Sequence, residues 1–138
     1  TKETTQIPRT FRLDRFVINS GNTITAMATV RMLKEDGTKV EEVAQGDGPI
    51  DAAFHAIESI VGRRLHLEDY KLQSITEGKD ALGDATVALS EEGRERNGKP
   101  VITKGRGLST DVIEASLIAY INAVNKLIYE EREHGAQV

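Results

Sequence analysis

The stretch TITAMATVRML, residues 23–33, carries the clearest structural signal in the chain. Its apolar residues of one parity are Ile24, Ala26, Ala28, Val30 and Met32. A period of two places such residues on the same face of a β-strand. The stretch therefore predicts a strand with one buried face.

Part of this strand belongs to an internal repeat, in which segments of the first half return in the same order in the second half. The matched pairs are ATVRML with ATVALS (28–33 and 85–90), FRLDRFVINSG with YKLQSITEGKD (11–21 and 70–80), and GDG with GRG (46–48 and 105–107). The pairs lie 57, 59 and 59 positions apart. Because two repeats are too few for a solenoid, we expect two units that cover each other's apolar faces.

The first unit is predicted to contain three strands and a helix. The other two strands are expected at residues 11–19 and 39–45, with a phase slip near Asp14 and a hairpin turn at 35–37. The helix is indicated by apolar residues at helical spacing, namely Ile50, Ala53, Phe54, Ile57, Ile60 and Val61. Gly62 is expected to end it.

The second unit is expected to repeat this order. Its strands are predicted at residues 67–76, 81–90 and 101–104, with a polar hairpin loop at 91–99 and a glycine loop at 105–107. Ser109, Thr110 and Asp111 offer caps for a helix at 111–131. This helix is apolar around much of its girth, so either the first unit or a second subunit must cover it.

These patterns predict an α+β fold of two pseudo-twofold β-β-β-α units, with mostly antiparallel strands packed on two helices. The units are expected at residues 11–66 and 67–138, together forming one domain with a polar C-terminal tail. Residues 1–10 are expected to be a linker or disordered end. The sequence leaves the strand order open.

Composition excludes several classes of protein. The 138 residues carry a net charge of -4, which argues against a nucleic-acid partner, since such proteins need a basic face. The absence of cysteine excludes disulfides, thiolate metal sites and a cysteine nucleophile. No apolar run approaches membrane-spanning length, so we expect a cytoplasmic protein without a membrane partner. The first residue is Thr, which favours a piece of a longer protein.

The loop AQGDGPI, residues 44–50, stands at the start of the first predicted helix. It lacks the Lys and hydroxyl of a Walker-type phosphate loop and the third glycine of a dinucleotide loop, and Asp47 would repel a phosphate. Two readings remain open. The loop is either a tight turn with Pro49 at the first helical position, or a site where the helix start faces a carboxylate and a nearby acid faces an ammonium group.

Catalytic and metal-binding patterns are weak. His55, His66 and His134 are widely separated and form neither an HxH nor an HExxH motif. Ser109 and Thr110 fit a helix cap better than a nucleophile. We expect no catalytic site, no metal site and no cofactor in this chain.

Three segments together resemble a known family. They are GDGPIDA, LEDYKLQSITEGKDALGDA and GRGLSTDVIEASLIAYINAVNKL, at residues 46–52, 67–85 and 105–127. They are similar to the C-terminal regulatory domain of 2-isopropylmalate synthases, and the resemblance runs from about residue 11 to residue 128. Citramalate synthases carry a related domain.

The resemblance implies an allosteric homodimerisation domain whose effector is leucine. In the family it is joined to a catalytic TIM barrel that condenses acetyl-CoA with 2-oxoisovalerate using a divalent metal. The resemblance also implies effector contacts at Gly46, Asp47, Gly48, Ile50, Asp51, Leu67, Tyr70, Ser74, Ala81 and Gly83. Asp47 departs from the Asn that the family often has. An isoleucine-binding domain of the citramalate type and a dimerisation module without a working pocket remain alternatives.

Overall fold

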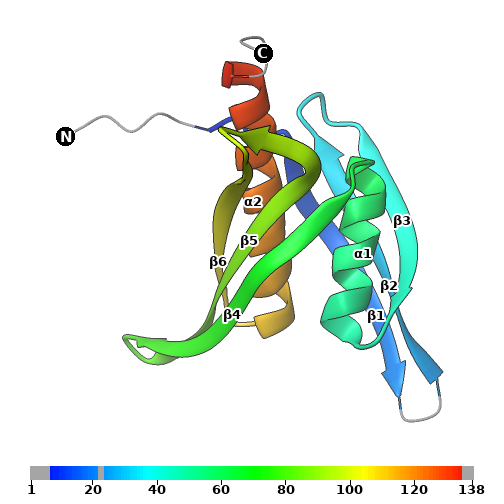
Figure 1. The fold of residues 1–138 in the computed structure, drawn as a ribbon. Coiled ribbons are helices and arrows are strands. Elements are labelled where there is room, and N and C mark those ends of the chain that lie inside the picture. The colour runs from blue at the N-terminus through cyan, green and yellow to red at the C-terminus, as the bar shows by residue number, and fades with distance from the viewer. Residues whose placement is uncertain (1–6, 22–23, 135–138) are drawn as a thin grey trace.

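The computed structural model describes residues 7–21 and 24–134, and it contains two β-β-β-α units in succession (Figure 1). The first unit comprises β1 (Phe11–Gly21), β2 (Ile24–Lys34), β3 (Lys39–Gly46) and α1 (Pro49–Val61). The second comprises β4 (Leu65–Glu77), β5 (Asp80–Arg96), β6 (Lys99–Ser109) and α2 (Val112–His134). The predicted α+β fold is confirmed, and the two units join at residues 62–64. Of the predicted linker, residues 7–10 precede β1 and residues 1–6 lie outside the described chain.

Each unit forms a three-stranded antiparallel sheet in which the strands follow one another, β1-β2-β3 and β4-β5-β6. Short hairpins make this order favourable, because sequential strands can pair without a crossover. Both first strands carry a register shift, at Asp14 in β1 and at Glu68 in β4. The phase slip predicted near Asp14 is thus confirmed. The bulged carboxylates accept hydrogen bonds from the neighbouring strands, Asp14 from Arg31 at 2.8 Å and Glu68 from Ser90 at 2.6 Å.

The structural repeat agrees with the sequence repeat in the middle strands. Ala28 and Ala85, 57 positions apart, occupy equivalent buried places in β2 and β5. The other two offsets were wrong. Phe16 pairs with the middle strand as Tyr70 does, 54 positions later. The helix caps, at residues 48 and 111, are 63 positions apart. Insertions in the hairpins cause these changes, because they lengthen the strands without altering the inward-facing rows.

The predicted glycine loop at residues 105–107 is also wrong, because these residues lie inside β6. A Cβ atom at Gly105 would collide with the backbone oxygen of Ala119, and one at Gly107 would collide with that of Ala115. The missing side chains therefore let α2 lie directly on the strand. In this segment glycine serves close backbone packing and not a turn.

The polar segment at residues 91–99, predicted as a loop, is mostly strand. β5 continues to Arg96, and the chain reverses at Asn97 and Gly98, whose φ angles are 57° and 76°. Positive φ at both positions is typical of the Asn-Gly hairpin turn. Charged side chains concealed this strand because ion pairs with α2, and not apolar packing, hold it.

The helix predictions are confirmed with small changes at the ends. α1 ends at Gly62, whose φ of 75° is left-handed and whose N–H donates to the Glu58 carbonyl oxygen at 2.9 Å. The second helix is longer than the predicted range of 111–131, since α2 continues to His134, while residues 135–138 of the predicted polar tail lie outside the described chain. α2 is long and apolar enough to span a membrane, but 61% of its most apolar window is buried inside the protein. It is therefore a core helix.

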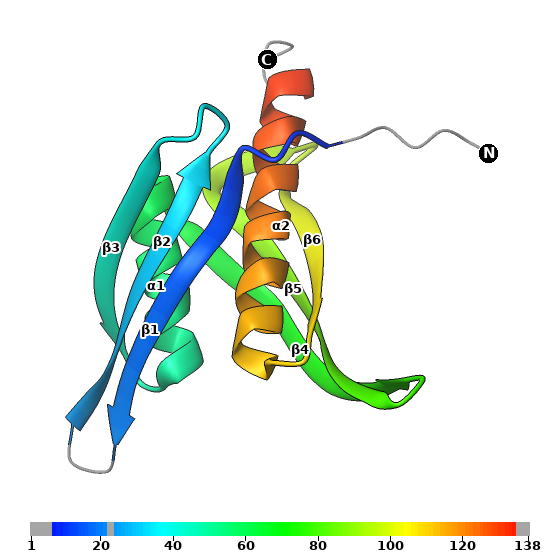
Figure 2. The ribbon, with the colours of Figure 1, turned by 180° about the vertical axis from the view of Figure 1, so that it is seen from behind.

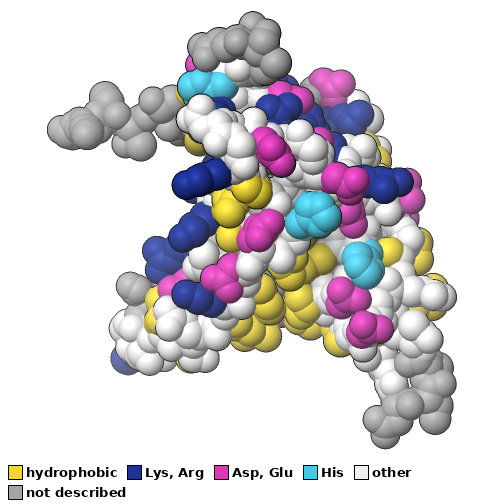
Figure 3. All heavy atoms as spheres, viewed as in Figure 1, with side chains coloured by type: hydrophobic (Ala, Val, Ile, Leu, Met, Phe, Trp, Pro, Cys, Tyr) yellow, Lys and Arg dark blue, Asp and Glu magenta, His cyan; other side chains and the backbone are white. Residues whose placement is uncertain are grey.

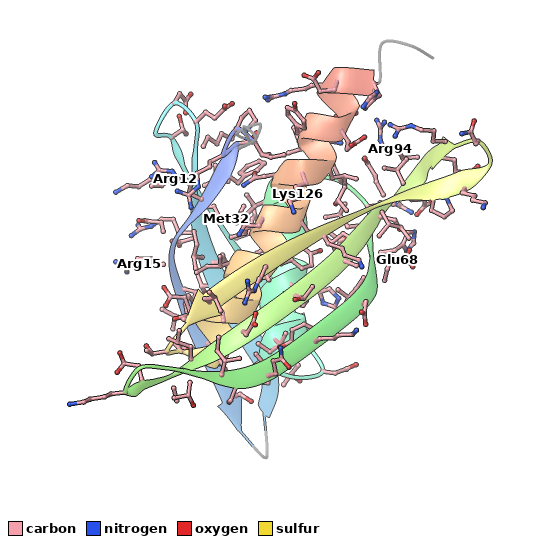
Figure 4. The ribbon with its side chains drawn as sticks, turned by 90° about the vertical axis from the view of Figure 1, so that its left-hand side faces the viewer. Arg12, Arg15, Met32, Glu68, Arg94 and Lys126 are labelled. Atoms are coloured by element: carbon pink, nitrogen blue, oxygen red, sulfur yellow. The ribbon has the colours of Figure 1, made fainter. Side chains whose placement is uncertain are left out.

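The two sheets form the arms of an inverted V, with the helices on their inner faces (Figures 1 and 2). α1 covers the first sheet, α2 covers the second, and the helices touch where the arms meet. There the ring of Phe54 lies 4.5 Å from that of Tyr120, centroid to centroid. Met32 points from β2 into the same core and is fully buried (Figure 4). The arrangement buries both apolar sheet faces while leaving the lower ends of the arms apart.

Candidate functional site

The loop between β3 and α1 is held in shape by its own polar groups. Asp51 accepts a hydrogen bond from the Asp47 backbone N–H at 2.9 Å, and His55 contacts the Gln45 carbonyl oxygen at 3.0 Å through Nδ1. The other ring nitrogen of His55 lies 3.6 Å from Asp51. A Cβ atom at Gly46 would lie 2.7 Å from the Asp51 carboxylate, so the loop closes tightly only with glycine there. In this structure, Asp51 and Gly46 shape the loop.

Gly48 differs from the other loop glycine. It is the N-cap of α1 with extended backbone angles, φ -157° and ψ 177°, which any residue can adopt. Apart from Gly48 itself and its two chain neighbours, no described residue has an atom within 4 Å of the place where its Cβ would be. Neither conformation nor packing within the described chain therefore requires glycine at this position.

The two helix starts also differ in their capping. Asp111 caps α2 by accepting hydrogen bonds from the N–H groups of Ile113 at 2.9 Å and Glu114 at 3.4 Å. At α1, no side chain of the described residues bonds the first N–H groups at the cap. The N–H of Ile50 consequently stays available at the positive end of the helix dipole. Such a start can receive a carboxylate.

On the other arm, the predicted β4 residues share the helix-facing side of the second sheet. Leu67, Tyr70 and Ser74 pair with the inward-facing residues Leu89, Val87 and Gly83 of β5. The Tyr70 hydroxyl lies 2.6 Å from the Ser116 hydroxyl, and its ring meets Phe54 edge-on at 5.6 Å. Tyr70 thereby connects β4 to both helices.

The two small residues of β5 have different surroundings. A Cβ atom at Gly83 would lie 3.0 Å from a Val112 methyl group, so this glycine makes room for the first turn of α2. Ala81 lies nearer the β4–β5 turn, opposite Thr76, and is exposed. Packing against α2 alone therefore explains why position 83 is a glycine.

The ten predicted contacts thus fall into two groups. One surrounds the start of α1, and the other lies along the inner face of β4 and β5. Between the arms, apolar side chains gather on the surface (Figure 3). On the helix-facing side of β4 and at the start of α2, three large apolar residues remain 42–49% exposed: Leu67, Leu72 and Val112. Within the described chain, this gap is an open apolar surface and not a closed pocket.

Two cavities among the described residues lie elsewhere. One of about 410 Å³ lies between β1 and α2, and one of about 630 Å³ lies between residues 7–9, Arg106 of β6 and α2; Arg9 and Asn122 line both. None of the ten predicted residues lines either one. Among residues 7–21 and 24–134, no cluster of three or more His, Asp or Glu could hold a metal ion.

Sequence reasoning missed three residues beside the predicted contacts, namely Phe54, Val112 and Ser116. Phe54 was recognised as part of an apolar helix face, but periodicity could not show that it meets Tyr70. Val112 and Ser116 sit one turn apart on α2, and the Ser116 hydroxyl donates to the Val112 carbonyl oxygen at 2.9 Å. Only the approach of α2 to β4 and β5 places them at the gap.

Comparison with known proteins identifies the family of this chain. Residues 1–128 match the family described as the LeuA allosteric (dimerisation) domain. The chain belongs to this family. The expected regulatory, non-catalytic character is thereby confirmed, and so is the resemblance stated from the three sequence segments.

Full-length relatives carry the name 2-isopropylmalate synthase. The protein from Carboxydothermus hydrogenoformans is 44% identical over 134 residues, which are 97% of this chain and 25% of the relative. Those from Ruminiclostridium cellulolyticum and Clostridium kluyveri are 44% and 43% identical over 93% and 90% of this chain, and 24% and 23% of their own lengths. The chain therefore spans about a quarter of the length of these curated relatives.

Proposed function

We propose that this chain is the regulatory domain of a 2-isopropylmalate synthase and that leucine is its feedback effector. The observation that carries the proposal is Gly48, a glycine at an uncapped helix start with open space before it and no structural reason to be glycine. A ligand or second protomer that approaches the backbone closely supplies such a reason.

The chemistry around Gly48 suits an amino acid. The free N–H groups and the dipole of α1 favour the carboxylate, and Asp47 offers a charge for the ammonium group. The apolar gap, with Leu72 and Val112 on its wall, offers cover for a branched side chain. Because the two groups of predicted contacts stand on separate arms, a second copy seated in the gap would complete the enclosure.

The rest of the parent protein follows from the relatives' name. We propose that a catalytic barrel in the same cytoplasmic polypeptide condenses acetyl-CoA with 2-oxoisovalerate, and that its divalent metal is held there, with no cofactor in this domain. Leucine would bind one arrangement of the dimer better than the other and shift the population towards it.

Thermal shifts with leucine, isoleucine and valine test the effector. We expect leucine to raise the melting temperature most. A larger shift with isoleucine would favour the citramalate type, since moving one methyl group changes binding by only about 1–3 kcal/mol. An intact dimer whose melting temperature is unchanged by all three amino acids would favour a dimerisation module without a working pocket.

Gly48→Asp separates binding from folding. Aspartate is a good N-cap residue, so the variant should melt at the same or a slightly higher temperature without ligand. Its carboxylate would occupy the ligand's place at the helix start, so the leucine shift should disappear. The control is Gln45→Asp, which adds the same charge on the outward face of β3, in the row of Met27. A full leucine shift in Gly48→Asp would remove this position from the site.

A further inference from the structure

The two helices break the internal symmetry of the domain. α1 has 13 residues and α2 has 23, and their cap positions, Gly48 and Asp111, correspond in the two units, so the last ten residues of α2, 125–134, have no counterpart in the first unit. Ten helical residues extend about 15 Å. This α2 extension runs past the point where the arms meet (Figure 2).

The extension begins with a buried contact to the opposite unit. Asn125 is 4% exposed, and its side-chain amide makes two hydrogen bonds to the backbone of Phe11. The Phe11 N–H donates to Oδ1 at 3.0 Å, and Nδ2 donates to the Phe11 carbonyl oxygen at 3.0 Å. The amide thus replaces a neighbouring strand at the free edge of β1.

One turn and a half later, the extension makes ion pairs with the connection between the units and with the first unit. Glu131 accepts a hydrogen bond from Arg63, in that connection, at 2.6 Å, and a second from Arg94 of its own unit at 2.7 Å. Figure 4 shows Arg94 on the β5–β6 hairpin beside the last turns of α2. Arg132 lies 3.7 Å from Glu35 in the β2–β3 turn.

This one segment therefore holds two separate parts of the first unit, the start of β1 and the β2–β3 turn, together with the connection between the two units. We propose that the α2 extension is a latch that fixes the angle between the two units and so sets the width of the apolar gap. The family match ends at residue 128, before Glu131 and Arg132.

The parts of the latch differ in strength. Loss of the Asn125 amide would leave buried backbone groups of Phe11 without partners, which is costly. The ion pairs are partly exposed, with 23% and 36% of the Arg63 and Glu131 side chains accessible, so salt screens them. As the salt concentration rises, the ion pairs of Glu131 and Arg132 should therefore loosen before the Asn125 hydrogen bonds do.

Distances between spin labels on the two arms test the latch directly. Because the chain has no cysteine, Val43→Cys in β3 and Ile102→Cys in β6 provide unique attachment points, both about half exposed in the wild type. Labelled protein is diluted with unlabelled protein so that distances within one chain dominate. We expect one narrow distribution in this background, and a broadened or shifted one after Asn125→Ala or Glu131→Gln.

The matched control is Glu130→Gln, one residue away. Glu130 pairs at 3.1 Å with Arg96 and at 3.8 Å with His134, both of the second unit, so its loss should leave the distribution narrow. Unchanged widths in folded Asn125→Ala and Glu131→Gln would overturn the proposal. If Asn125→Ala does not fold, the proposal is tested with the same spin labels in Glu131→Gln and in the wild type titrated to about 1 M salt.

A leucine titration adds a second readout that rests on the proposed function. If loosening leaves about a tenth of the molecules at the binding angle, leucine affinity should fall about tenfold in Glu131→Gln and stay unchanged in Glu130→Gln. Failure of the wild type to bind leucine would refute the proposed function, while the distances between the spin labels would still test the latch. Equal leucine affinity in both variants, with altered distances in Glu131→Gln, would refute the link between gap width and binding.

Discussion

The hydroxyl groups of Tyr70 and Ser116 lie 2.6 Å apart and join β4 to α2 beside the ring of Phe54. This contact is the point where the edge strand of the second sheet, its own helix and the helix of the first unit meet. The same Ser116 hydroxyl also bonds the Val112 carbonyl oxygen. Tyr70 thereby connects three elements that bound the apolar gap: its hydroxyl joins β4 to α2, and its ring packs against Phe54 of α1.

Tyr70→Phe should therefore weaken the fold modestly. The ring keeps its packing against Phe54 and the Ser116 hydroxyl keeps its bond to Val112, so we expect a loss of about 1 kcal/mol in the free energy of unfolding. Tyr70→Ala should cost clearly more, because the aromatic packing goes as well. Urea denaturation measures both, and equal stability of the two variants would contradict this account of the contact.

Gly105→Ala should destabilise the protein strongly, because the added methyl group collides with the backbone of α2 at Ala119. Overpacking of this kind costs about 1–3 kcal/mol or more when the neighbour is backbone. Gly48→Ala, whose methyl group meets open space, should cost less than about 1 kcal/mol, as expected for a changed helix cap. Denaturant midpoints of the two variants side by side give the comparison, and the reverse order would show that α2 can move off β6.

Acid should weaken the domain through Asp84. Hydrogen bonds from Arg106, at 2.9 Å to each carboxylate oxygen, lower the pKa of Asp84 below its ordinary value. The folded state therefore binds this proton less readily than the unfolded chain, whose aspartates titrate near about 3.9. The contribution is complete above that pH and disappears as the pH falls through the lower, folded-state value.

Arg106→Gln checks this assignment. The stability difference between the wild type and the variant should be constant above about pH 5 and should shrink as the pH falls below about 4. Lys104→Gln, a change of the same charge two residues earlier on β6, should give a difference without this trend. Urea midpoints across the pH range supply the data, and a constant difference for Arg106→Gln would show that Asp84 does not depend on this arginine.

Much of the fold could be predicted because its signals are local. Alternation in residues 23–33 and the helical spacing from Ile50 to Val61 each report one element and its buried face. A hairpin loop was expected at residues 91–99, but its turn was not narrowed to Asn97 and Gly98, although this dipeptide is a strong hairpin signal, because the charged residues around it resemble a loop. Their ion pairs with α2 are long-range contacts that no local pattern records.

The candidate site was less accessible to such reasoning. Sequence could associate Gly46, Gly48, Gly83 and Gly105 with loops or small-residue walls, yet these four glycines have three different roles. Gly46 closes its loop, Gly83 and Gly105 admit α2, and Gly48 alone among the four has open space where its Cβ would stand. Backbone approach between distant segments decides such roles, and a glycine looks the same in sequence in every case.

By itself, the sequence determined the two-unit α+β architecture, the element types and the family, because periodicity and motif content belong to short segments. Tertiary structure decided how the repeats superimpose, which glycines serve packing, and how the arms are held. Asn125 shows the reason: its partner Phe11 is 114 positions away, and a buried amide that replaces a strand neighbour leaves no pattern in the residues around it.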